Sequence, residues 1–368
     1  MRILITGSEG FIGKNLVVHL SEIGGYEVFR HPRGQSLERL AELVNKIDVI
    51  VHLAGTNRPP QDDEFFKGNA ELTEVLCDLI KKSGRPIPLV ITSSTQVELS
   101  NPYGQSKLMA EHFAETLSTE NGSPVIIYRL PNVFGKWCRP NYNSVVATFC
   151  HNIANNLPIN INDSSTKLNL VYVDDVVSDI ISQIKNLSLG LKRPKVGPIH
   201  SITLGELASQ IATFKECSST LIIEKVGVGL VRALYATYVS YLPPSHFVYD
   251  LPQHGDERGL FVEMLKTKDS GQFSFFTAKP GVTRGGHYHH TKTEKFLVIS
   301  GSARFKFRNI LTDECCEIAV SGKESRVVET IPGWAHDITN VGEDELIVML
   351  WANEIFNRDQ PDTYESKV

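Results

Sequence analysis

Several features that would indicate other classes of protein are missing from this sequence of 368 residues. Its six cysteines include no Cys-x-x-Cys pair, so we interpret them as reduced residues of a cytoplasmic protein. No apolar run approaches the ~20 residues that a membrane helix needs. The chain opens directly into the apolar run Arg2-Ile3-Leu4-Ile5, which leaves no room for a signal peptide. The formal net charge is −5 and no basic stripe is present, so no nucleic-acid or membrane partner is expected.

The length is sufficient for two domains, each with a core of its own. Residues 241–254 contain three prolines and no periodicity, and we place a boundary near residue 243, between domains 1–243 and 244–368. Before the boundary, apolar runs alternate with helical stretches, which predicts an α/β fold with a parallel, doubly wound sheet. After it, short alternating runs predict an all-β barrel or sandwich; they are Gln272–Thr277, Phe296–Ile299, Ala303–Phe307, Ser325–Glu329 and Glu345–Trp351.

A glycine-rich turn follows the first predicted strand. The sequence RILITGSEGFIG places three glycines between that strand and a helix predicted over residues 14–20. Such a turn lets a pyrophosphate approach the backbone and the helix N-terminus. The spacing differs by one residue from the usual GxGxxG, and three glycines in an ordinary strand-to-helix turn are the alternative. The candidate cofactor contacts here are Gly7, Gly10, Phe11, Ile12 and Gly13.

Residues at the end of the second predicted strand indicate which nicotinamide cofactor, NAD or NADP(H), the site binds. An NAD site usually has an acidic residue there for the ribose 2′-hydroxyl, but this chain has Arg30 and Arg33. Arginines suit a 2′-phosphate, which favours NADP(H), although a solvated basic turn would look the same. The third predicted strand continues into Leu53, Ala54 and Gly55. The last two residues are small and would leave room for the cofactor to pass.

A Ser, Tyr and Lys set occupies the stretch VITSSTQVELSNPYGQSKLMAE, residues 90–111. Ser94 ends a predicted strand, and the i,i+4 spacing puts Tyr103 and Lys107 on one face of a helix. An adjacent cation is expected to lower the pKa of the phenol. Such a phenol can exchange a proton with a carbonyl oxygen, which Ser94 would hold, while a hydride moves at the carbon. Asn69, at the start of another helical stretch, could join a proton relay or cap that helix.

Residues 1 to about 240 resemble an extended short-chain dehydrogenase/reductase that modifies nucleotide sugars. The resemblance is carried by the TGSEGFIG turn, Asp48 with His52-Leu-Ala-Gly55, Ser94, Tyr103, Lys107 and Pro131-Asn132. It implies that Ser94, Tyr103 and Lys107 are catalytic and that the segment after the Pro-Asn turn holds a nucleotide diphosphate. Asn132, Arg139 and Asn143 are therefore substrate-binding candidates, unless this loop only caps the sheet.

A second site is predicted in the all-β region. His287 and His289 are two residues apart on a strand and share a face, Glu294 follows, and His336 lies in a later Pro-Gly turn. Three imidazoles and a carboxylate suit Zn²⁺ or another divalent metal, although a histidine-rich hairpin without metal is possible. The spacing resembles the first motif of the cupin fold. The second motif, which contains His336, lacks the residue that cupins usually carry between the Pro and the Gly.

Over its whole length the chain resembles the CapF-type bifunctional enzymes of capsule and O-antigen synthesis. The matching stretches are residues 135–144, 287–290, 294–298, 351–354 and 360–364. The resemblance implies that the cupin epimerises C3 of UDP-2-acetamido-2,6-dideoxy-hexos-4-ulose. The first domain would then reduce the C4 ketone with NADPH, giving UDP-N-acetyl-6-deoxy-L-talosamine on the path to UDP-N-acetyl-L-fucosamine. Tyr103 would be the proton donor, and a homodimer is expected.

Two other hypotheses remain at this point. The cupin could serve only as a structural or dimerisation module of a 4-keto-sugar-nucleotide reductase, or the chain could be a non-catalytic NADP(H)-binding regulator. The acid and base of the cupin site are not identified by the sequence. Lys295, Tyr288 and His290 lie near the predicted metal ligands, and each could equally be a packing residue.

Overall fold

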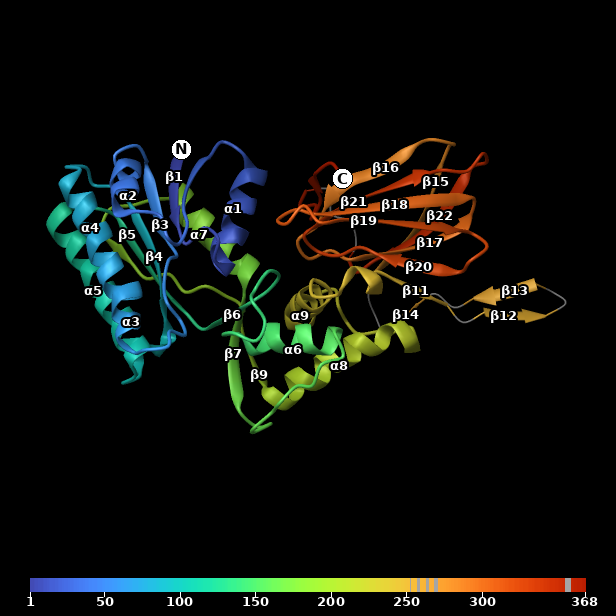
Figure 1. Ribbon diagram of the computed structural model, residues 1–368, viewed down its shortest axis with the longest axis horizontal. Helices are drawn as coiled ribbons and strands as arrows, with labels where there is room; N and C mark the ends of the chain where they lie inside the picture. Colours follow the sequence, from blue (N-terminus) through green and yellow to red (C-terminus); the bar gives the residue numbers. More distant parts are fainter. Residues whose placement is uncertain (252, 257–258, 263–264, 268–270, 355–358) are drawn as a thin grey trace. The chain divides into compact units, whose positions relative to one another are not determined.

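The computed structural model describes residues 1–251, 253–256, 259–262, 265–267, 271–354 and 359–368. Its contacts divide the chain into two compact units (Figure 1). Unit 1 comprises Met1–Ser144 and Leu168–Ile202, and unit 2 comprises Val145–Lys167 and Thr203–Val368. This grouping assigns three helices from before residue 243 to the same unit as the antiparallel strands. The boundary near residue 243 stays a prediction about domains in chain order, and the two units are described separately.

Unit 1 is built on a six-stranded parallel sheet in the order β2-β1-β3-β4-β5-β8. Its strands are β1 (Arg2–Thr6), β2 (Glu27–His31), β3 (Val49–His52), β4 (Leu89–Ser94), β5 (Val125–Leu130) and β8 (Leu191–Lys192). A three-stranded sheet consists of β6 (Asn132–Phe134), β7 (Lys167–Tyr172) and β9 (Ile199–Thr203). The parallel pairing of β1 to β5 confirms the predicted doubly wound α/β fold.

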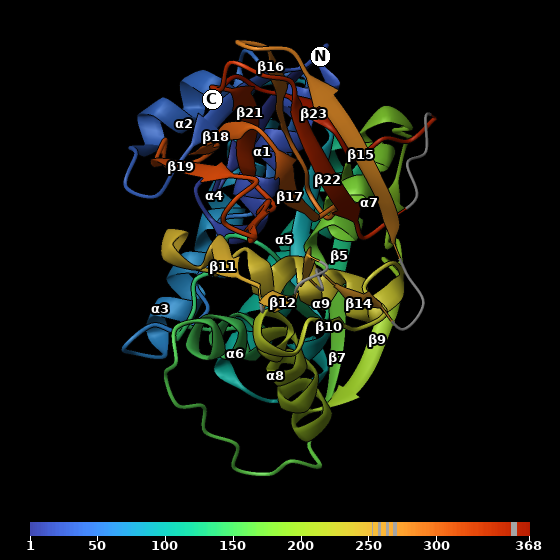
Figure 2. The ribbon, with the colours of Figure 1, turned by 90° about the vertical axis from the view of Figure 1, so that its right-hand side faces the viewer.

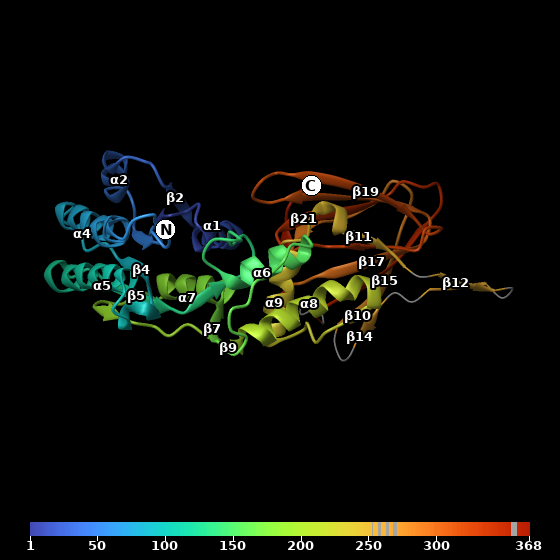
Figure 3. The same ribbon diagram turned by 60° about the horizontal axis from the view of Figure 1, so that its bottom comes forward.

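Helices cover both faces of the six-stranded sheet, as is usual for a parallel sheet whose central strands are buried. The helices of unit 1 are α1 (Phe11–Ile23), α2 (Leu37–Val44), α3 (Asp63–Phe65), α4 (Leu72–Lys82), α5 (Pro102–Asn121) and α7 (Val173–Lys185), with a π-helix η1 (Phe66–Glu71) and a 3₁₀ helix η2 (Thr95–Glu98). Side chains of α2, α4 and α5 form one core with alternate residues of β1, β3, β4 and β5. Figure 3 shows α4 and α5 side by side, and α1 packs with α7.

Unit 2 contains two five-stranded sheets that form two layers (Figure 2). Within each sheet, neighbouring strands are antiparallel. One has the order β11-β20-β17-β22-β15, formed by β11 (Val248–Asp250), β20 (Arg326–Glu329), β17 (Glu294–Ser300), β22 (Leu346–Ala352) and β15 (Gln272–Ala278). The other has the order β19-β18-β21-β16-β23, formed by β19 (Cys315–Ser321), β18 (Ser302–Asn309), β21 (Trp334–Asn340), β16 (Thr283–Tyr288) and β23 (Tyr364–Glu365). The predicted all-β region is confirmed.

The remaining elements of unit 2 are three packed helices and several short segments. The helices are α6 (Val145–Ala154), α8 (Leu204–Thr220) and α9 (Gly229–Val239), which contact one another. The short segments are β10 (Ile222–Ile223), η3 (Pro244–His246), β12 (Gln253–Asp256), β13 (Gly259–Val262) and β14 (Lys266–Thr267). Among the described residues, no helix has the length and apolar character needed to span a membrane. The six cysteines form no disulfide.

Candidate functional sites

The glycine turn lies where the sequence places it, between β1 and α1. Gly7 has φ +66°, and a Cβ there would lie 2.6 Å from the backbone nitrogen of Ala54. A Cβ on Gly13 would lie 2.2 Å from the Gly7 carbonyl oxygen. The turn is therefore packed so closely that side chains are excluded. The helix begins at Phe11, three residues before the predicted start, and no side chain caps its N-terminus.

The other predicted cofactor residues surround the same edge of the sheet. Arg30 and Arg33 are exposed at the carboxyl end of β2, next to β1. Leu53 and Ala54 follow β3 and donate backbone hydrogen bonds to the carbonyl and hydroxyl oxygens of Thr6, at 3.2 and 3.3 Å. Because β1, β2 and β3 are parallel neighbours, their carboxyl ends form one crevice, the usual position of a dinucleotide in such sheets.

Ser94, Tyr103 and Lys107 come together from β4 and α5. Asn101 caps the N-terminus of α5, because its side chain accepts a hydrogen bond of 2.7 Å from the backbone N–H of Gly104. Tyr103 lies in the first turn of that helix and hydrogen-bonds with Ser94. Lys107 is buried one turn further on, and its ammonium donates to the Thr92 carbonyl oxygen at 3.1 Å.

The sequence predicts that Lys107 lowers the pKa of Tyr103, but in the structure this pKa is raised. Burial raises the pKa of Tyr103, and the hydrogen bond with Ser94 only partly opposes that. Burial also lowers the pKa of Lys107 to about 8, against the opposing influence of the Glu111 carboxylate. The physical reason is that both side chains are removed from water, so that desolvation outweighs neighbouring charges.

Asn69 neither caps α4 nor lies at its first residue, since it is part of the π-helix η1. Its side-chain amide accepts a hydrogen bond from Thr56 N at 2.9 Å and donates to Thr56 O and Ser106 Oγ, both at 3.0 Å. Ser106 in turn donates to the carbonyl oxygen of Tyr103 at 2.8 Å. Asn69 therefore ties the loop after Gly55 to the first turn of α5.

The three predicted substrate-binding residues are exposed, from the start of β6 to the loop that follows it. Asn132 donates to the Asn169 carbonyl oxygen at 3.3 Å, and the Arg139 guanidinium lies 5.1 Å from the ring centre of Tyr142. Asn143 is exposed close to the end of the loop.

The sequence did not single out the residue that anchors this loop. Lys136 is fully buried and its ammonium lies 2.8 Å from a carboxylate oxygen of Asp174, at the start of α7. The signal was a lysine directly after Gly135 and an acidic pair after β7, but only the fold brings them together.

The four predicted metal ligands converge between the two sheets of unit 2. His287 is on β16, His289 directly follows it, Glu294 begins β17 and His336 is on β21. Their ligand atoms all lie within 4.8 Å of one another. The shorter turn between Pro332 and Gly333 does not displace His336 from this group, which we call the His₃Glu cluster.

The protonation state of the His₃Glu cluster suits a cation. Burial, followed by the charges of the neighbouring imidazoles, lowers the pKa of His287 to about 3. Burial opposes ionisation of Glu294, but hydrogen bonds with His289 and His336 hold the pKa of this carboxyl well below its usual range. The His289 Nδ1 lies 2.5 Å from the Asp362 carbonyl oxygen, which can only accept. Because Nδ1 donates to Asp362, loss of the proton on Nε2 frees a lone pair beside a Glu294 oxygen 3.2 Å away, where a cation can take the place of that proton. A cation between the two atoms makes this arrangement favourable, so the residues fit a divalent metal.

The three residues near the cluster in sequence differ in position. Lys295 lies outside the cluster, where its ammonium is 2.7 Å from a Glu329 carboxylate oxygen. Tyr288 and His290 pack against each other and against Tyr364, with ring centres 4.9–5.6 Å apart. Lys295 and His290 therefore do not join the four ligands.

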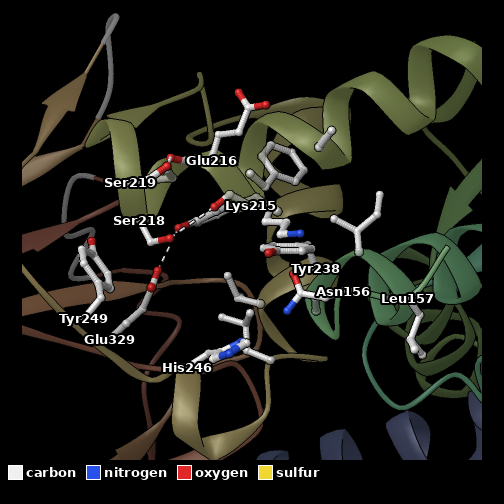
Figure 4. A pocket seen from close by; sticks show the side chains of 18 of the residues that line it. Asn156, Leu157, Lys215, Glu216, Ser218, Ser219, Tyr238, His246, Tyr249 and Glu329 are labelled. Atoms are coloured by element: carbon white, nitrogen blue, oxygen red, sulfur yellow. Dashed lines mark hydrogen bonds between the residues drawn. The ribbon is translucent and has the colours of Figure 1, made fainter. Parts of the chain in front are cut away.

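Lys295 instead contributes to a cavity of about 990 Å³ within unit 2 (Figure 4). The cavity is lined by residues of α6, α8 and α9 together with Lys295, Tyr249 and Glu329 from the strands. Tyr235 donates to Glu329 at 2.8 Å, and Lys295 donates to the Tyr249 hydroxyl at 3.2 Å. Burial is the main cause that raises the pKa of Tyr249 to about 12. None of the catalytic, cofactor-binding, substrate-binding or metal-binding residues predicted from the sequence lines this cavity.

Two family models match the chain. Residues 3–193 match the NAD-dependent epimerase/dehydratase family, and residues 254–364 match the polysaccharide biosynthesis C-terminal domain. The first model covers more than half of the chain and contains the glycine turn, Ser94, Tyr103 and Lys107.

Individual proteins match as well. UDP-2-acetamido-2,6-beta-L-arabino-hexul-4-ose reductase of Pseudomonas aeruginosa is 56% identical over 368 residues, covering 100% of this chain and 99% of that protein. dTDP-4-dehydro-6-deoxyglucose reductase of Escherichia coli is 25% identical over 233 residues, covering 50% of this chain and 72% of that protein. The crystal structure of capsular polysaccharide assembling protein CapF from Staphylococcus aureus matches with a TM-score of 0.68 and 42% identity, and covers 100% of both chains. The chain therefore belongs to the NAD-dependent epimerase/dehydratase family, and over its full length to the CapF-type enzymes that also carry a polysaccharide biosynthesis C-terminal domain.

Proposed function

We propose that this chain is a bifunctional nucleotide-sugar enzyme. Its first activity is the C3 epimerisation of UDP-2-acetamido-2,6-dideoxy-hexos-4-ulose, and its second is the NADPH-dependent reduction of the C4 ketone to UDP-N-acetyl-6-deoxy-L-talosamine. The observation that carries the proposal is the pairing of two sites in one chain: Ser94, Tyr103 and Lys107 in unit 1, and the His₃Glu cluster in unit 2. The 56% identity over the full length to a UDP-2-acetamido-2,6-beta-L-arabino-hexul-4-ose reductase supports the substrate class.

In the reductive step, a reduced nicotinamide bound at the edge of the sheet would be the source of the hydride for the carbonyl carbon. The Tyr103 hydroxyl donates its proton to the carbonyl oxygen, so that an alcohol and a phenolate result. A raised pKa keeps Tyr103 protonated before that transfer, and Ser94 lies within hydrogen-bonding distance of the same hydroxyl. Lys107 stabilises the phenolate by its charge and is the candidate to hold the cofactor ribose. Arg30 and Arg33, exposed at the end of β2, support the choice of NADPH, whose 2′-phosphate they would bind.

In the epimerisation step, a divalent metal bound by the His₃Glu cluster would polarise the C4 carbonyl and so acidify the C3–H bond. His287, His289, Glu294 and His336 would hold the metal. Asn132, Arg139 and Asn143 are proposed as contacts of the nucleotide diphosphate in unit 1, where all three are exposed.

The test is an incubation of the 4-keto sugar nucleotide in D₂O, with and without NADPH, followed by NMR of C3 and C4. We expect Tyr103→Phe to lose NADPH oxidation by about 10²–10⁴-fold while deuterium still enters at C3. In His289→Ala, deuterium incorporation at C3 should be lost while NADPH oxidation persists. If the wild-type chain reduces the ketone but incorporates no deuterium at C3 without NADPH, the cupin is only a structural or dimerisation module of a reductase. Turnover of no keto-sugar nucleotide would contradict both activities.

We also propose a homodimer formed through the outer strand of one sheet. β15 is the last strand in the described order of its sheet, and Phe273 and Phe275 on it are 46% and 72% exposed. Exposed aromatic residues on a sheet edge are typical of association surfaces. The test is light scattering after gel filtration, in which Phe275→Glu should elute as a monomer, whereas the exposed control Lys323→Glu should not. A monomeric wild-type chain would contradict this proposal.

A further inference from the structure

Residues near the C-terminus of the chain lie beside the His₃Glu cluster. β23 pairs antiparallel with β16, with Glu365 opposite His287 and Tyr364 opposite Tyr288. One residue further along, the backbone N–H of Ser366 donates to the Gly286 carbonyl oxygen at 2.8 Å. We call residues 359–366 the C-terminal strap, and its residues 364–366 pair with the strand that carries the first metal ligand.

One side chain of the strap holds the turn between the ligands. The Asp362 carboxylate accepts hydrogen bonds from three consecutive backbone N–H groups, those of residues 290, 291 and 292, at 2.8, 2.6 and 2.6 Å. It also accepts from the Thr291 hydroxyl at 2.8 Å. This turn joins His289 to Glu294. Because hydrogen bonds to an ionised acceptor are short and strong, Asp362 fixes the backbone between two ligands.

The main chain of the same residue orients one ligand directly. The Asp362 carbonyl oxygen accepts the Nδ1 proton of His289 at 2.5 Å. This hydrogen bond selects the tautomer in which Nε2 carries the lone pair, and Nε2 is the atom that faces Glu294. Partners of this kind determine the orientation of a metal-binding imidazole, and their loss typically weakens metal binding 10–100-fold.

We propose that Asp362 is a positioning residue of the metal centre, through which the C-terminal strap sets the tautomer of His289 and its distance from Glu294. This inference rests on the proposed metal-dependent function of the cluster. It goes beyond that proposal because it assigns a part of the metal affinity to a residue that is not a ligand and that lies 68 positions beyond Glu294 in the chain.

The test compares zinc affinity, by competition with a chromophoric chelator, between the wild type, Asp362→Asn and Glu365→Gln. The asparagine variant keeps the shape but turns an N–H₂ group toward backbone donors. We expect its zinc dissociation constant to rise 10–100-fold. Glu365→Gln removes the same charge from an exposed position of the same strap, and its zinc affinity should be unchanged. The Co²⁺-loaded protein gives a second readout, since the visible bands of the bound ion should shift in Asp362→Asn alone.

Thr291→Val removes the hydroxyl donor to Asp362, together with the acceptor of a hydrogen bond from Arg232, and is the milder variant if Asp362→Asn does not fold. It should lose zinc affinity in the same direction but by less. Wild-type affinity and an unchanged Co²⁺ spectrum in the folded Asp362 variant, or in Thr291→Val if only that variant folds, would overturn the inference while leaving the proposed metal centre intact. A wild-type chain that binds neither zinc nor cobalt would instead overturn the proposed metal centre.

Discussion

Glu294 and Lys295 are consecutive residues of β17, yet their side chains belong to different sites on opposite faces of the sheet. The Glu294 carboxylate is part of the His₃Glu cluster, whereas the Lys295 ammonium lies 2.7 Å from Glu329 beside the cavity of unit 2. The alternation of side chains along a strand is the reason. One strand therefore supports the metal cluster on one face and a buried ion pair on the other.

The buried ion pair predicts a large effect of removing one partner. In Lys295→Met, Glu329 would remain buried without its cation, which typically costs about 3–5 kcal/mol of unfolding free energy. Lys323→Met, in the exposed turn before β20, is the control and should change little. The measurement is urea denaturation. The double variant Lys295→Met/Glu329→Leu should recover most of the loss, and a Lys295→Met variant as stable as the wild type would contradict the prediction.

The pKa of Lys107 predicts the pH dependence of cofactor use. Because burial lowers this pKa to about 8, the ammonium loses its proton well below the ordinary 10.5. The charged form is needed to hold the ribose and stabilise the phenolate. We therefore expect kcat/KM for NADPH, which reports on the free enzyme, to fall as the pH rises through about 8.

A pair of variants tests whether Lys107 is the group responsible. The Glu111 carboxylate raises the pKa of Lys107, so Glu111→Gln should move the alkaline fall to a lower pH. Glu115→Gln, one turn further along α5, should leave it in place, because Glu115 pairs with Arg193 instead. A profile that is flat to pH 10, or that shifts equally in both variants, would argue against this assignment.

Gly55 predicts a steric effect on the reductase site. A Cβ at this position would lie 2.8 Å from Asn69 Oδ1 and 3.1 Å from the Lys107 ammonium. Gly55→Ala should displace Lys107 and lower kcat/KM for reduction, on the order of 10²-fold for a misplacement near 1 Å. Gly342→Ala is the control, because its nearest neighbouring atom would be 3.4 Å away. Steady-state kinetics of both variants provide the measurement, and equal rates would refute the prediction.

The choice between nicotinamide cofactors is predicted to depend on Arg33. A hydrogen bond to a charged phosphate contributes about 1.5–3 kcal/mol, so Arg33→Ala should lower kcat/KM for NADPH by roughly 10–100-fold. The value for NADH, which lacks the 2′-phosphate, should change little. Arg39→Ala, on the exposed surface of α2, serves as the control, since Arg39 pairs with Glu42. A wild-type preference for NADH would show that the arginines are only a solvated basic turn.

The sequence by itself determined the local features of this protein. The Tyr103 and Lys107 spacing and the alternation of His287 and His289 follow from helix and strand periods, and the three glycines mark the turn after β1. The structure places Tyr103 and Lys107 on α5, His287 on β16 and His289 directly after that strand. These features depend on neighbours in the chain, and so a sequence pattern can reveal them.

The tertiary structure decided the rest, because burial and partners depend on residues that are far apart in the chain. Burial, and not the charge of Lys107, dominates the pKa of Tyr103. Asp174 neutralises Lys136 from 38 positions away, and Asp362 reaches His289 from 73 positions away. No spacing rule connects such pairs, since only the packing of strands and helices brings them within hydrogen-bonding distance.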